Sequence, residues 1–307
     1  MKILITGSNG LLGQKIVLDL IAKPSIETIA TSLGENRMPH ANGYSYQSLD
    51  ITNPTQIDAA INQFQPDAII HTAAMTNVDA CESQRESCWA QNVDSISYFI
   101  KSIENFSNKE GKRIHFIHLS TDFIFDGENG PYDELAKPNP LSYYALSKNE
   151  SEKLLINSSI KWSILRTAIV YGIVNRMSRT NIVLWAKDSL SKGNKINVVD
   201  DQFRSPTLAE DLAQGCILTA IQGKEGIFNI SGKNIMSVLE LVYAVADFWK
   251  LDKTLVTPIK SATLNQAAKR PPRTGFILDK ARKELGYEPH SFMEGLAILD
   301  KQLSDSN

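Results

Sequence analysis

The sequence predicts an α/β fold: a doubly wound parallel sheet accompanied by a smaller, mostly helical C-terminal lobe. Short runs rich in β-branched residues alternate with longer helical patterns through the first half of the chain. A glycine-rich turn joins the first such run to the first helical pattern, and the alternation becomes irregular after Gly172. Repeated strand–helix alternation is typical of a parallel sheet covered by helices on both faces.

The expected strands of the first half are short apolar runs whose residue types fit buried positions in a sheet. They cover residues 2–6, 27–31, 44–50, 67–71, 113–120 and 162–170. Helical patterns lie between them, over residues 11–23, 53–64, 84–105 and 142–158. Asn53 and Pro54 mark the start of the second helix, because asparagine is a good N-cap and proline suits the first helical position.

Beyond Gly172 the sequence predicts a helix over 180–193, a loop over 201–207, a helix over 208–222 and a strand over 226–231. The remainder is expected to be helical, with proline-rich breaks such as 269–274. We therefore expect a main domain over 1–170, to which 206–231 returns. Residues 171–205 and 232–307 would form the smaller lobe beside it.

Composition and charge narrow the function classes. The 307 residues carry a net charge of −2, with 42% hydrophobic and 21% charged residues. No broad basic surface is expected, so neither nucleic acid nor an anionic membrane is a predicted partner. The three cysteines lack metal-ligand spacing, and we expect reduced thiols in a cytoplasmic protein without a catalytic metal. The sequence shows no signal-peptide core and no apolar stretch of about 20 residues.

The first strand is followed by a glycine-rich turn, in which Gly7, Gly10 and Gly13 have the spacing G-x-x-G-x-x-G. In a dinucleotide-binding turn the first glycine permits the tight turn, the second lets a pyrophosphate approach the backbone, and the third allows close helix–sheet packing. The N-terminus of the following helix then faces the phosphates. The spacing differs by one residue from G-x-G-x-x-G, but its position between a strand and a helix is the required one. A glycine-rich turn that binds nothing is the alternative.

The end of the second strand should indicate which nicotinamide cofactor is bound. An acidic side chain there would bind the ribose 2′-hydroxyl of NAD(H), whereas a basic one favours the 2′-phosphate of NADP(H). Thr31 and Ser32 occupy this place, and Arg37 lies within reach of the loop. The sequence therefore favours NADP(H). Glu35 keeps NAD(H) open, since it could still reach a ribose hydroxyl.

Two further strand ends complete the expected cofactor cleft. Asp50 and Ile51 follow the third strand, where a carboxylate and an apolar side chain could clamp an adenine. The small residues of segment 71–75 follow the fourth strand and would let a cofactor lie against the backbone. Without the glycine turn, each of these would be a plain strand-end loop.

The segment LSYYALSK, residues 141–148, places a lysine one helical turn after a tyrosine. Tyr144 and Lys148 share a helix face because they are four residues apart, whereas Tyr143 pairs with Ser147 and lacks a cation. A free phenol has a pKa of about 10, and a nearby ammonium lowers it. Tyr144 could then act as a general acid towards a substrate carbonyl as hydride arrives. An exposed tyrosine–lysine pair on a helix surface is the alternative interpretation.

A hydroxyl partner for Tyr144 should come from a neighbouring strand end. The fifth strand ends near Ser120 and Thr121, and either hydroxyl could bind the substrate oxygen and align it with the phenol. Lys148 could also hold the hydroxyls of the nicotinamide ribose.

Together these motifs resemble the extended short-chain dehydrogenase/reductase superfamily, and most of all the dTDP-4-dehydrorhamnose reductase family. The stretches that carry the resemblance are TGSNGLLGQ, HTAAMTNVDACE, STDFIFDGENGPYDE, PNPLSYYALSKNESEK, LRTAIVYG, DQFRSPTLAEDLA and KRPPRTGFILD. They cover nearly the whole chain. The resemblance implies a Rossmann-type NAD(P)-binding main domain and a substrate-binding smaller lobe. It also implies reduction of the 4-keto group of a nucleotide-linked deoxysugar.

The resemblance further implies the residues of the site. The expected catalytic residues are Thr121, Tyr144 and Lys148, with Thr121 preferred to Ser120 because it matches the family threonine in STD. The expected cofactor contacts are Gly7, Asn9, Gly10, Leu11, Leu12, Gly13, Ser32, Arg37, Asp50, Ile51, Ala73, Ala74, Met75, Asn92, Tyr144 and Lys148. The expected substrate contacts are Thr121, Asp122, Phe123, Tyr144, Arg204 and Arg270.

Two positions depart from the pattern of the rhamnose reductases. Ile169 stands where those enzymes usually have tryptophan, and Arg204 stands where they commonly have glycine. Both positions border the sugar pocket, so the identity of the sugar stays open. Arg204 resembles the regulatory β subunit of methionine adenosyltransferase. A nucleotide-sugar epimerase and a non-enzymatic regulatory subunit therefore remain alternative functions, and a homodimer is the expected assembly.

Overall fold

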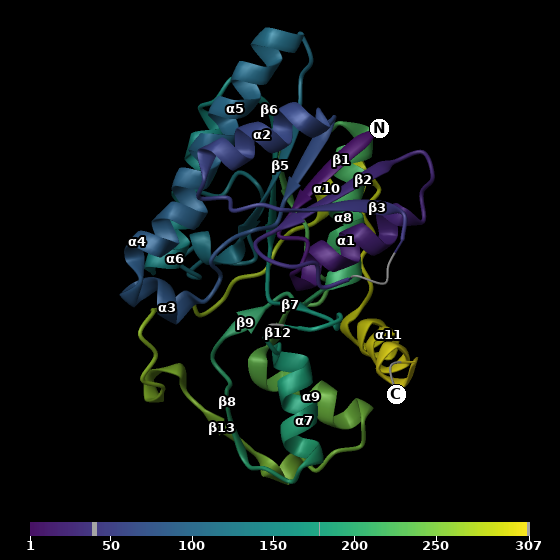
Figure 1. Ribbon diagram of the computed structural model, residues 1–307. Helices are drawn as coiled ribbons and strands as arrows, with labels where there is room; N and C mark the ends of the chain where they lie inside the picture. The colour runs from purple at the N-terminus through teal and green to yellow at the C-terminus, as the bar shows by residue number, and fades with distance from the viewer. Residues whose placement is uncertain (39–41, 178, 306–307) are drawn as a thin grey trace.

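The central sheet contains seven parallel strands within the residues that the computed structural model describes, 1–38, 42–177 and 179–305 (Figure 1). The strand order is β11-β6-β5-β4-β1-β2-β3. Their bounds are β1 (Lys2–Thr6), β2 (Glu27–Ser32), β3 (Tyr44–Ser48), β4 (Ala68–His71), β5 (His115–Thr121), β6 (Lys161–Thr167) and β11 (Gly226–Asn229). Every neighbouring pair is parallel.

Helices cover both faces of this sheet, which confirms the predicted doubly wound α/β fold (Figure 1). One face carries α1 (Leu11–Ile21), α8 (Ala209–Gln222) and α10 (Asp279–Leu285), and the other carries α2 (Pro54–Phe64), α5 (Ser95–Glu110) and α6 (Tyr143–Ile156). Asn53 caps α2 as predicted, since its side chain accepts hydrogen bonds from the backbone N–H groups of Thr55 and Gln56. Within the described ranges, no helix has the length and apolar character needed to cross a membrane.

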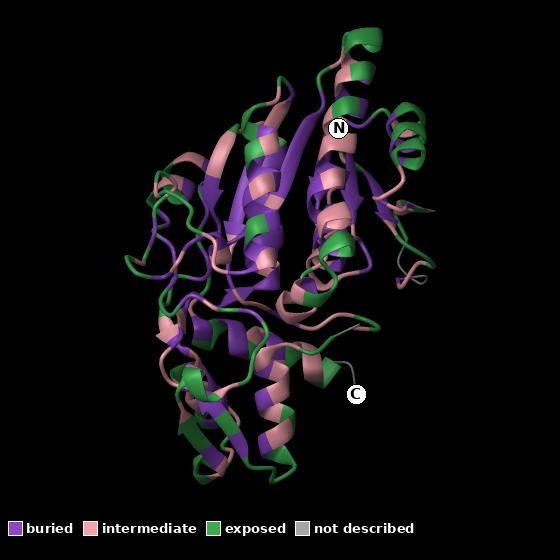
Figure 2. Cartoon of the chain, turned by 90° about the vertical axis from the view of Figure 1, so that its left-hand side faces the viewer, coloured by how far each residue is buried: buried purple, intermediate pink, exposed green. Residues whose placement is uncertain are grey.

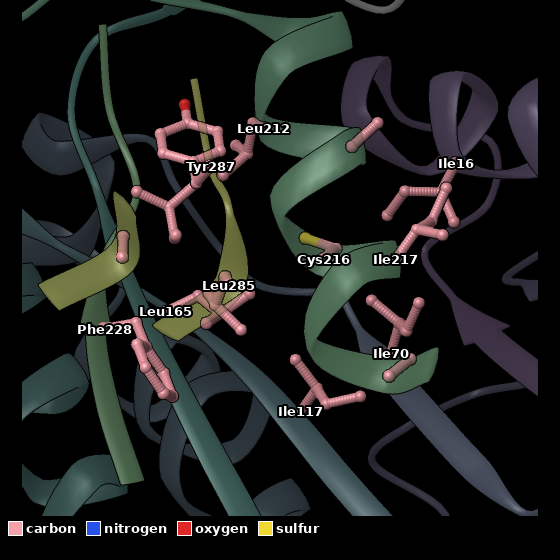
Figure 3. Close-up of a cluster of buried hydrophobic side chains, with 14 of the residues drawn as sticks. Ile16, Ile70, Ile117, Leu165, Leu212, Cys216, Ile217, Phe228, Leu285 and Tyr287 are labelled. Carbon is pink, nitrogen blue, oxygen red and sulfur yellow. The ribbon is translucent and has the colours of Figure 1, made fainter. Parts of the chain in front are cut away.

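Side chains alternate between the two faces along each strand, as the pleat requires. In β1, Ile3 and Ile5 pack into the apolar cluster under α1 and α8, whereas Leu4 packs into the cluster under α2 and α5. Figure 3 shows part of the first cluster, where Ile16 of α1 lies beside Ile217 of α8. Figure 2 shows the resulting layers: the strands are buried, and the helices present exposed residues on their outer sides.

A smaller lobe lies below the sheet in Figure 1. It contains α7 (Ile182–Ser191), α9 (Val238–Phe248) and the strands β8 (Ile196–Val199) and β13 (Val256–Ile259), which pair in parallel. The last helix, α11 (Phe292–Asp305), packs on the same apolar cluster. The sequence does not predict β8 or β13, because each is short and β13 contains a proline.

Two pairs of very short strands join the lobe to the sheet. They are β7 (Val170–Tyr171) with β10 (Thr207–Leu208) and β9 (Phe203–Arg204) with β12 (Met236–Ser237). The loop predicted over 201–207 therefore contains strand residues, and the strand predicted over 162–170 is interrupted after Thr167. Ile169 has a positive φ of 35°, a conformation that β-branched residues rarely adopt, so the chain turns here instead of extending the strand.

One predicted helix is wrong. In place of a single helix over 84–105 the structure has α3 (Val78–Ser83), α4 (Arg85–Trp89), a π-helical segment (Ala90–Asp94) and then α5. Asn77 caps this series by accepting a hydrogen bond from the backbone N–H of Ala80, and Gln84 separates α3 from α4 with non-helical backbone angles. Apolar spacing does not reveal such interruptions, because a π-helical turn shifts the helical register.

The strand order reverses between β1 and β4. From β1 the sheet continues outward to β2 and β3, and from β4 it continues outward to β5, β6 and β11. Such a reversal opens a crevice outside the carboxyl ends of the strands, which is the usual ligand position in open α/β sheets.

Candidate active site

A cleft of about 1150 Å³ lies at the carboxyl ends of the strands, with lining residues from both the sheet and the smaller lobe. The predicted cofactor contacts that line it are Gly7, Asn9, Gly10, Leu11, Leu12, Gly13, Ser32, Arg37, Asp50, Ile51, Ala73, Ala74, Tyr144 and Lys148. The predicted substrate contacts Thr121, Asp122, Phe123, Arg204 and Arg270 also line it. Met75 and Asn92 are not among its described lining residues.

The glycine turn has no room for side chains at two of its three glycines. Gly7 has a positive φ of 68°, and a Cβ placed on it would lie 2.7 Å from the backbone nitrogen of Ala73. A Cβ on Gly13 would lie 2.3 Å from the carbonyl oxygen of Gly7. Gly10 is the N-cap of α1 and offers no side-chain cap, and the first turn of α1 has no acidic residue. The unpaired N–H groups at this helix start therefore fit a phosphate.

Asn9 ties the loop after β2 to the glycine turn. Its amide nitrogen donates to the carbonyl oxygen of Glu35 at 2.8 Å, and its Oδ1 accepts from the backbone N–H of Arg37 at 2.9 Å. Ser32 and Arg37 line the cleft, whereas the exposed Glu35 is not among the lining residues that the structure describes. A hydroxyl and a guanidinium, rather than a carboxylate, therefore border this end of the cleft.

The carboxylate of Asp50 is fixed by its own loop. Its Oδ1 accepts hydrogen bonds from the backbone N–H of Thr52 at 2.8 Å and from the Thr52 hydroxyl at 2.7 Å. Ile51 lies beside it and is almost fully buried. The pair offers a fixed carboxylate next to an apolar surface, which suits an adenine, and the contact itself stays a prediction.

Asn92 lies outside the described lining of the cleft and connects two segments next to it. Its Oδ1 accepts from the backbone N–H of Met75 at 2.9 Å, and its Nδ2 donates to the carbonyl oxygen of Met75 at 3.0 Å. The same Nδ2 donates to the hydroxyl of Ser147 at 3.0 Å. Asn92 therefore fastens the loop after β4 to α6, the helix that carries the predicted catalytic pair.

The two adjacent tyrosines of α6 have different surroundings. The ring of Tyr144 is buried at the cleft and meets the ring of Phe123 edge-on, with centroids 6.3 Å apart. The ring of Tyr143 instead lies 4.9 Å from the guanidinium carbon of Arg85. The prediction that Tyr143 lacks a cation is therefore wrong. Helical spacing considers only residues of the same helix, whereas Arg85 comes from α4. Tyr143 is not among the described residues that line the cleft.

Burial dominates the ionisation of Tyr144. Desolvation raises the pKa of this phenol well above its usual value, and a hydrogen bond with Thr121 opposes the rise. The prediction of a lowered phenol pKa is therefore wrong, because the loss of solvation destabilises the phenolate more than its neighbours stabilise it. Burial also lowers the pKa of Lys148 to about 8, and Glu152 acts in the opposite direction. At neutral pH the phenol holds its proton.

Two hydroxyls at the end of β5 reach the cleft. The Thr121 hydroxyl donates to Oδ1 of Asp122 at 3.2 Å and accepts from the backbone N–H of Phe123 at 3.2 Å. Ser120 also lines the cleft, and its buried Oγ has no hydrogen-bond partner in the described part of the chain. The side chain of Thr121 lowers the pKa of the Tyr144 phenol, which favours Thr121 over Ser120 as its hydroxyl partner.

A buried charge pair lies beside the end of β5. Asp122 accepts a hydrogen bond from the hydroxyl of Thr274, and its Oδ2 lies 3.8 Å from Nε of Arg204. Burial raises the pKa of Asp122, and Arg204 opposes the rise. The terminal nitrogens of Arg204 donate to the carbonyl oxygens of Phe203 and Pro271, each at 2.7 Å. Much of the guanidinium therefore holds the proline-rich segment in place, and a sugar contact stays a prediction.

Arg270, which lines the cleft, is paired with a residue outside its described lining. Its two terminal nitrogens donate to the carboxylate of Asp79 at 3.1 and 2.6 Å. Asp79 belongs to α3, beside the sheet, whereas Arg270 belongs to the C-terminal segment. The sequence offers no signal for this pair, since the two residues are 191 positions apart.

The structure also brings into the site a histidine, His118, that the sequence patterns do not single out. Nε2 of His118 lies 3.1 Å from Nζ of Lys148. His118 lies three positions before Thr121 on β5, and this short spacing to a predicted catalytic residue is the signal that could have identified it. In the described ranges, no group of three or more His, Cys, Asp or Glu side chains is arranged to hold a metal ion.

Comparison with known proteins places this geometry in context. A family model described as the RmlD substrate binding domain matches residues 1–304. The chain is 30% identical over 307 residues to dTDP-4-dehydrorhamnose reductase of Aggregatibacter actinomycetemcomitans, covering 96% of this chain and 97% of that protein. It is 28% identical over 275 residues to methionine adenosyltransferase 2 subunit beta of Danio rerio, covering 88% and 80%. A solved dTDP-4-dehydrorhamnose reductase from Bacillus anthracis, in complex with NADP, matches 98% of this chain and 99% of that chain at 25% identity with a TM-score of 0.81.

Proposed function

The chain belongs to the RmlD substrate binding domain family, and from this premise we propose that it reduces the 4-keto group of a nucleotide-linked deoxysugar with NAD(P)H, as a dTDP-4-dehydrorhamnose reductase does. The convergence of Thr121, Tyr144 and Lys148 with the glycine turn in one cleft is the observation that carries the proposal. Reduction of a carbonyl needs a hydride on carbon and a proton on oxygen, and this cleft combines a dinucleotide-binding turn with a buried phenol.

The residues of the chain handle the oxygen of the substrate. Bound at the glycine turn, the reduced cofactor supplies the hydride. Tyr144 donates its proton to the carbonyl oxygen as negative charge develops there, and Thr121 aligns the same oxygen through its hydroxyl. The ammonium of Lys148 stabilises the phenolate that remains, because opposite charges attract strongly in a buried site.

NADP(H) is the preferred cofactor of this proposal, with NAD(H) as the second choice. Ser32 and Arg37 border the cleft where a 2′-phosphate would lie, and the carboxylate-bearing Glu35 is exposed. The solved relative from Bacillus anthracis contains NADP, which supports the same preference.

The smaller lobe completes the proposed substrate site. The division places the cofactor on residues 1–170 with 206–231 and the substrate on 171–205 with 232–307, of which 306–307 lie outside the described residues. The sugar nucleotide would lie between the two, near Asp122, Phe123, Arg204 and Arg270. A homodimer in the cytoplasm is part of the proposal, and the mass of the purified protein in solution checks the assembly.

The experiment is an assay of the purified chain with NADPH and a dTDP-4-keto-6-deoxyhexose. The Tyr144→Phe variant loses the proton donor, and general acid catalysis contributes roughly 100-fold or more, so turnover should fall by that factor. Tyr143→Phe is the matched control, since its ring lies outside the described lining of the cleft, and it should keep its turnover. Full turnover by Tyr144→Phe contradicts the mechanism.

Two alternatives give different results in the same assay. An epimerase retains its cofactor through purification and consumes no net NADPH. A regulatory subunit, which the similarity to methionine adenosyltransferase 2 subunit beta favours, binds a partner enzyme without reducing the sugar. Oxidation of one NADPH for each alcohol formed supports the reductase against both.

A further inference from the structure

Lys148 has an uncommon partner for a buried cation. Its side chain is only 3% exposed, and its Nζ lies 3.1 Å from Nε2 of His118. Among the described residues no carboxylate forms an ion pair with it: Glu152, one turn further along α6, is paired with Arg166 at 2.7 Å. A buried ammonium needs hydrogen-bond acceptors, and His118 supplies one.

His118 is itself enclosed. Its ring stacks on that of His71 with centroids 5.7 Å apart, and its Nδ1 is buried with no partner in the described ranges. Its Nε2 has a second neighbour, the hydroxyl of Ser151, at 3.0 Å. Burial, Lys148 and His71 all lower the pKa of His118 well below its usual value, so the imidazole is neutral.

One nitrogen cannot serve both neighbours at once. The Ser151 hydroxyl donates to the carbonyl oxygen of Lys148 at 2.6 Å, so its oxygen can only accept a proton from Nε2. An ammonium, in contrast, can only donate to Nε2. A charge-assisted hydrogen bond is roughly twice as strong as a neutral one. While Lys148 is charged, Nε2 therefore accepts from the lysine and the ring proton lies on Nδ1.

A neutral acceptor has an advantage beside Tyr144. A carboxylate at this place would cancel the charge of the ammonium and weaken its attraction for the phenolate that forms when Tyr144 gives up its proton. A neutral imidazole fixes the position of the ammonium and leaves its charge intact.

From these contacts we propose that His118 is a positioning residue, which holds the ammonium of Lys148 in place through Nε2 and changes its ring tautomer when Lys148 loses its charge. The positioning role deepens the proposed reductase function and rests on it. The tautomer change is a property of the chain alone.

The groups that face this pair come from several elements. His71 lies on β4, Glu152 on α6 is paired with Arg166 on β6, and the thiol of Cys88 lies on α4. Burial and Lys148 lower the pKa of His71 to about 3, so it stays neutral near pH 7. Lys148, whose pKa burial lowers to about 8, loses its charge as the pH rises through that value.

The first experiment requires no turnover. Nitrogen NMR of the full chain with labelled histidine shows which ring nitrogen carries the proton, and His118→Gln identifies the signals of His118. We expect Nε2 without a proton at neutral pH. In Lys148→Met the proton should move to Nε2, where it can donate to Ser151. A proton on Nε2 in the parent protein, or an unchanged tautomer in Lys148→Met, overturns the proposal.

The second experiment measures kcat against pH in two variants of His118. His118→Leu removes the acceptor and should lower kcat about tenfold, which corresponds to the loss of one charge-assisted hydrogen bond. The alkaline limb of the profile should move to lower pH, because the ammonium loses the group that stabilises it. His118→Gln keeps an acceptor and should restore most of kcat and the original limb.

His115 offers a matched control on the same strand. It is also buried, and its Nε2 is hydrogen-bonded to Ser163 at 2.7 Å. His115→Leu should lose stability but keep both kcat and the pH profile. If His118→Leu and His118→Gln lose kcat equally and the alkaline limb of the profile does not move, His118 has only a packing role. That result would overturn the proposed positioning of Lys148. If the parent protein reduces no 4-keto sugar, the reductase proposal fails, and the NMR result alone decides the pairing of His118 with Lys148.

Discussion

The two halves of the cleft are built by different means. The half proposed to bind the cofactor depends on backbone, because Gly7 and Gly13 lack side chains where chain segments approach closely. The half proposed to bind the substrate depends on charged side chains from distant segments, such as Asp122 with Arg204 near the end of β5. A tightly packed turn is disrupted when a substitution adds an atom. A buried ion pair is disrupted when a substitution removes one of the two charged groups.

Substitutions in the two halves should therefore have different effects, on ligand affinity in one and on stability in the other. An added methyl group in the glycine turn should affect binding and leave most of the fold intact. A lost partner in the substrate half leaves an uncompensated charge inside the protein, so its cost falls on the free energy of unfolding. The following variants test this separation.

The largest effect is expected from Arg204→Met. The change leaves the buried Asp122 without its cation and frees the carbonyl oxygen of Pro271, and breaking a buried pair costs about 3–5 kcal/mol. Urea denaturation measures the loss. The double variant Arg204→Met with Asp122→Asn should recover part of it, because the charge is gone. Equal losses in the single and the double variant would show that Arg204 acts only through the carbonyl contacts.

Gly13→Ala should act on the other half of the cleft. Its methyl group would lie 2.3 Å from the carbonyl oxygen of Gly7, so the turn must move away from the shape that a pyrophosphate fits. We expect a roughly 10- to 100-fold weaker affinity for NADPH, about 1.4–2.8 kcal/mol. Fluorescence titration measures that affinity. Gly111→Ala is the control, since nothing lies within 4 Å of its Cβ, although its positive φ of 67° makes it costly for stability. Unchanged binding in Gly13→Ala would refute the steric account.

Acid should destabilise the sheet beneath both halves. Burial lowers the pKa of His71 to about 3 and that of His115 to about 4, below the 6.5 of an unfolded histidine. The unfolded chain therefore binds protons first as the pH falls below 6.5. Stability is complete above that pH and is lost down to the folded pKa values, at about 1.4 kcal/mol per pH unit for each histidine. His115→Phe should show a correspondingly smaller slope in denaturation between pH 6 and pH 4, and an identical slope contradicts the assignment.

The smallest effect is expected from Asp79→Asn. The carboxylate is 42% exposed, and partly exposed ion pairs contribute about 1 kcal/mol or less, so the KM for the sugar nucleotide should rise only a few-fold while kcat is kept. Asp279→Asn, in the exposed pair with Arg282, is the control and should change neither. A lower KM in Asp79→Asn would mean that Asp79 competes with the substrate for Arg270.

The same difference between the two halves decides which parts of the cleft can be predicted from the sequence. The backbone of the proposed cofactor half follows from local sequence, because the glycine turn, β1 and the Asn53 cap depend on residues close together in the chain. The face shared by Tyr144 and Lys148 follows from helical spacing alone. The pKa of Tyr144 does not, since it depends on burial by Cys81, Cys88 and other residues of separate elements.

The substrate half was named only in part. The resemblance indicates Arg204 and Arg270, but neither Pro271 as an acceptor nor Asp79 as a partner can be inferred from local patterns. The interruption of the helix over 84–105 has a similar origin, since the π-helical segment serves Asn92 and its bond to Ser147 on another helix.

The order in which the sheet is completed has a consequence for synthesis of the chain. Helix α1 leaves the ribosome early, yet α8, which covers the same apolar cluster (Figure 3), and β11, which closes the open edge of β6, are made only after α7 and β8 of the smaller lobe. A nascent chain that ends near Tyr171 would therefore present bare apolar surface and an open sheet edge at β6, the features that promote chaperone binding and aggregation.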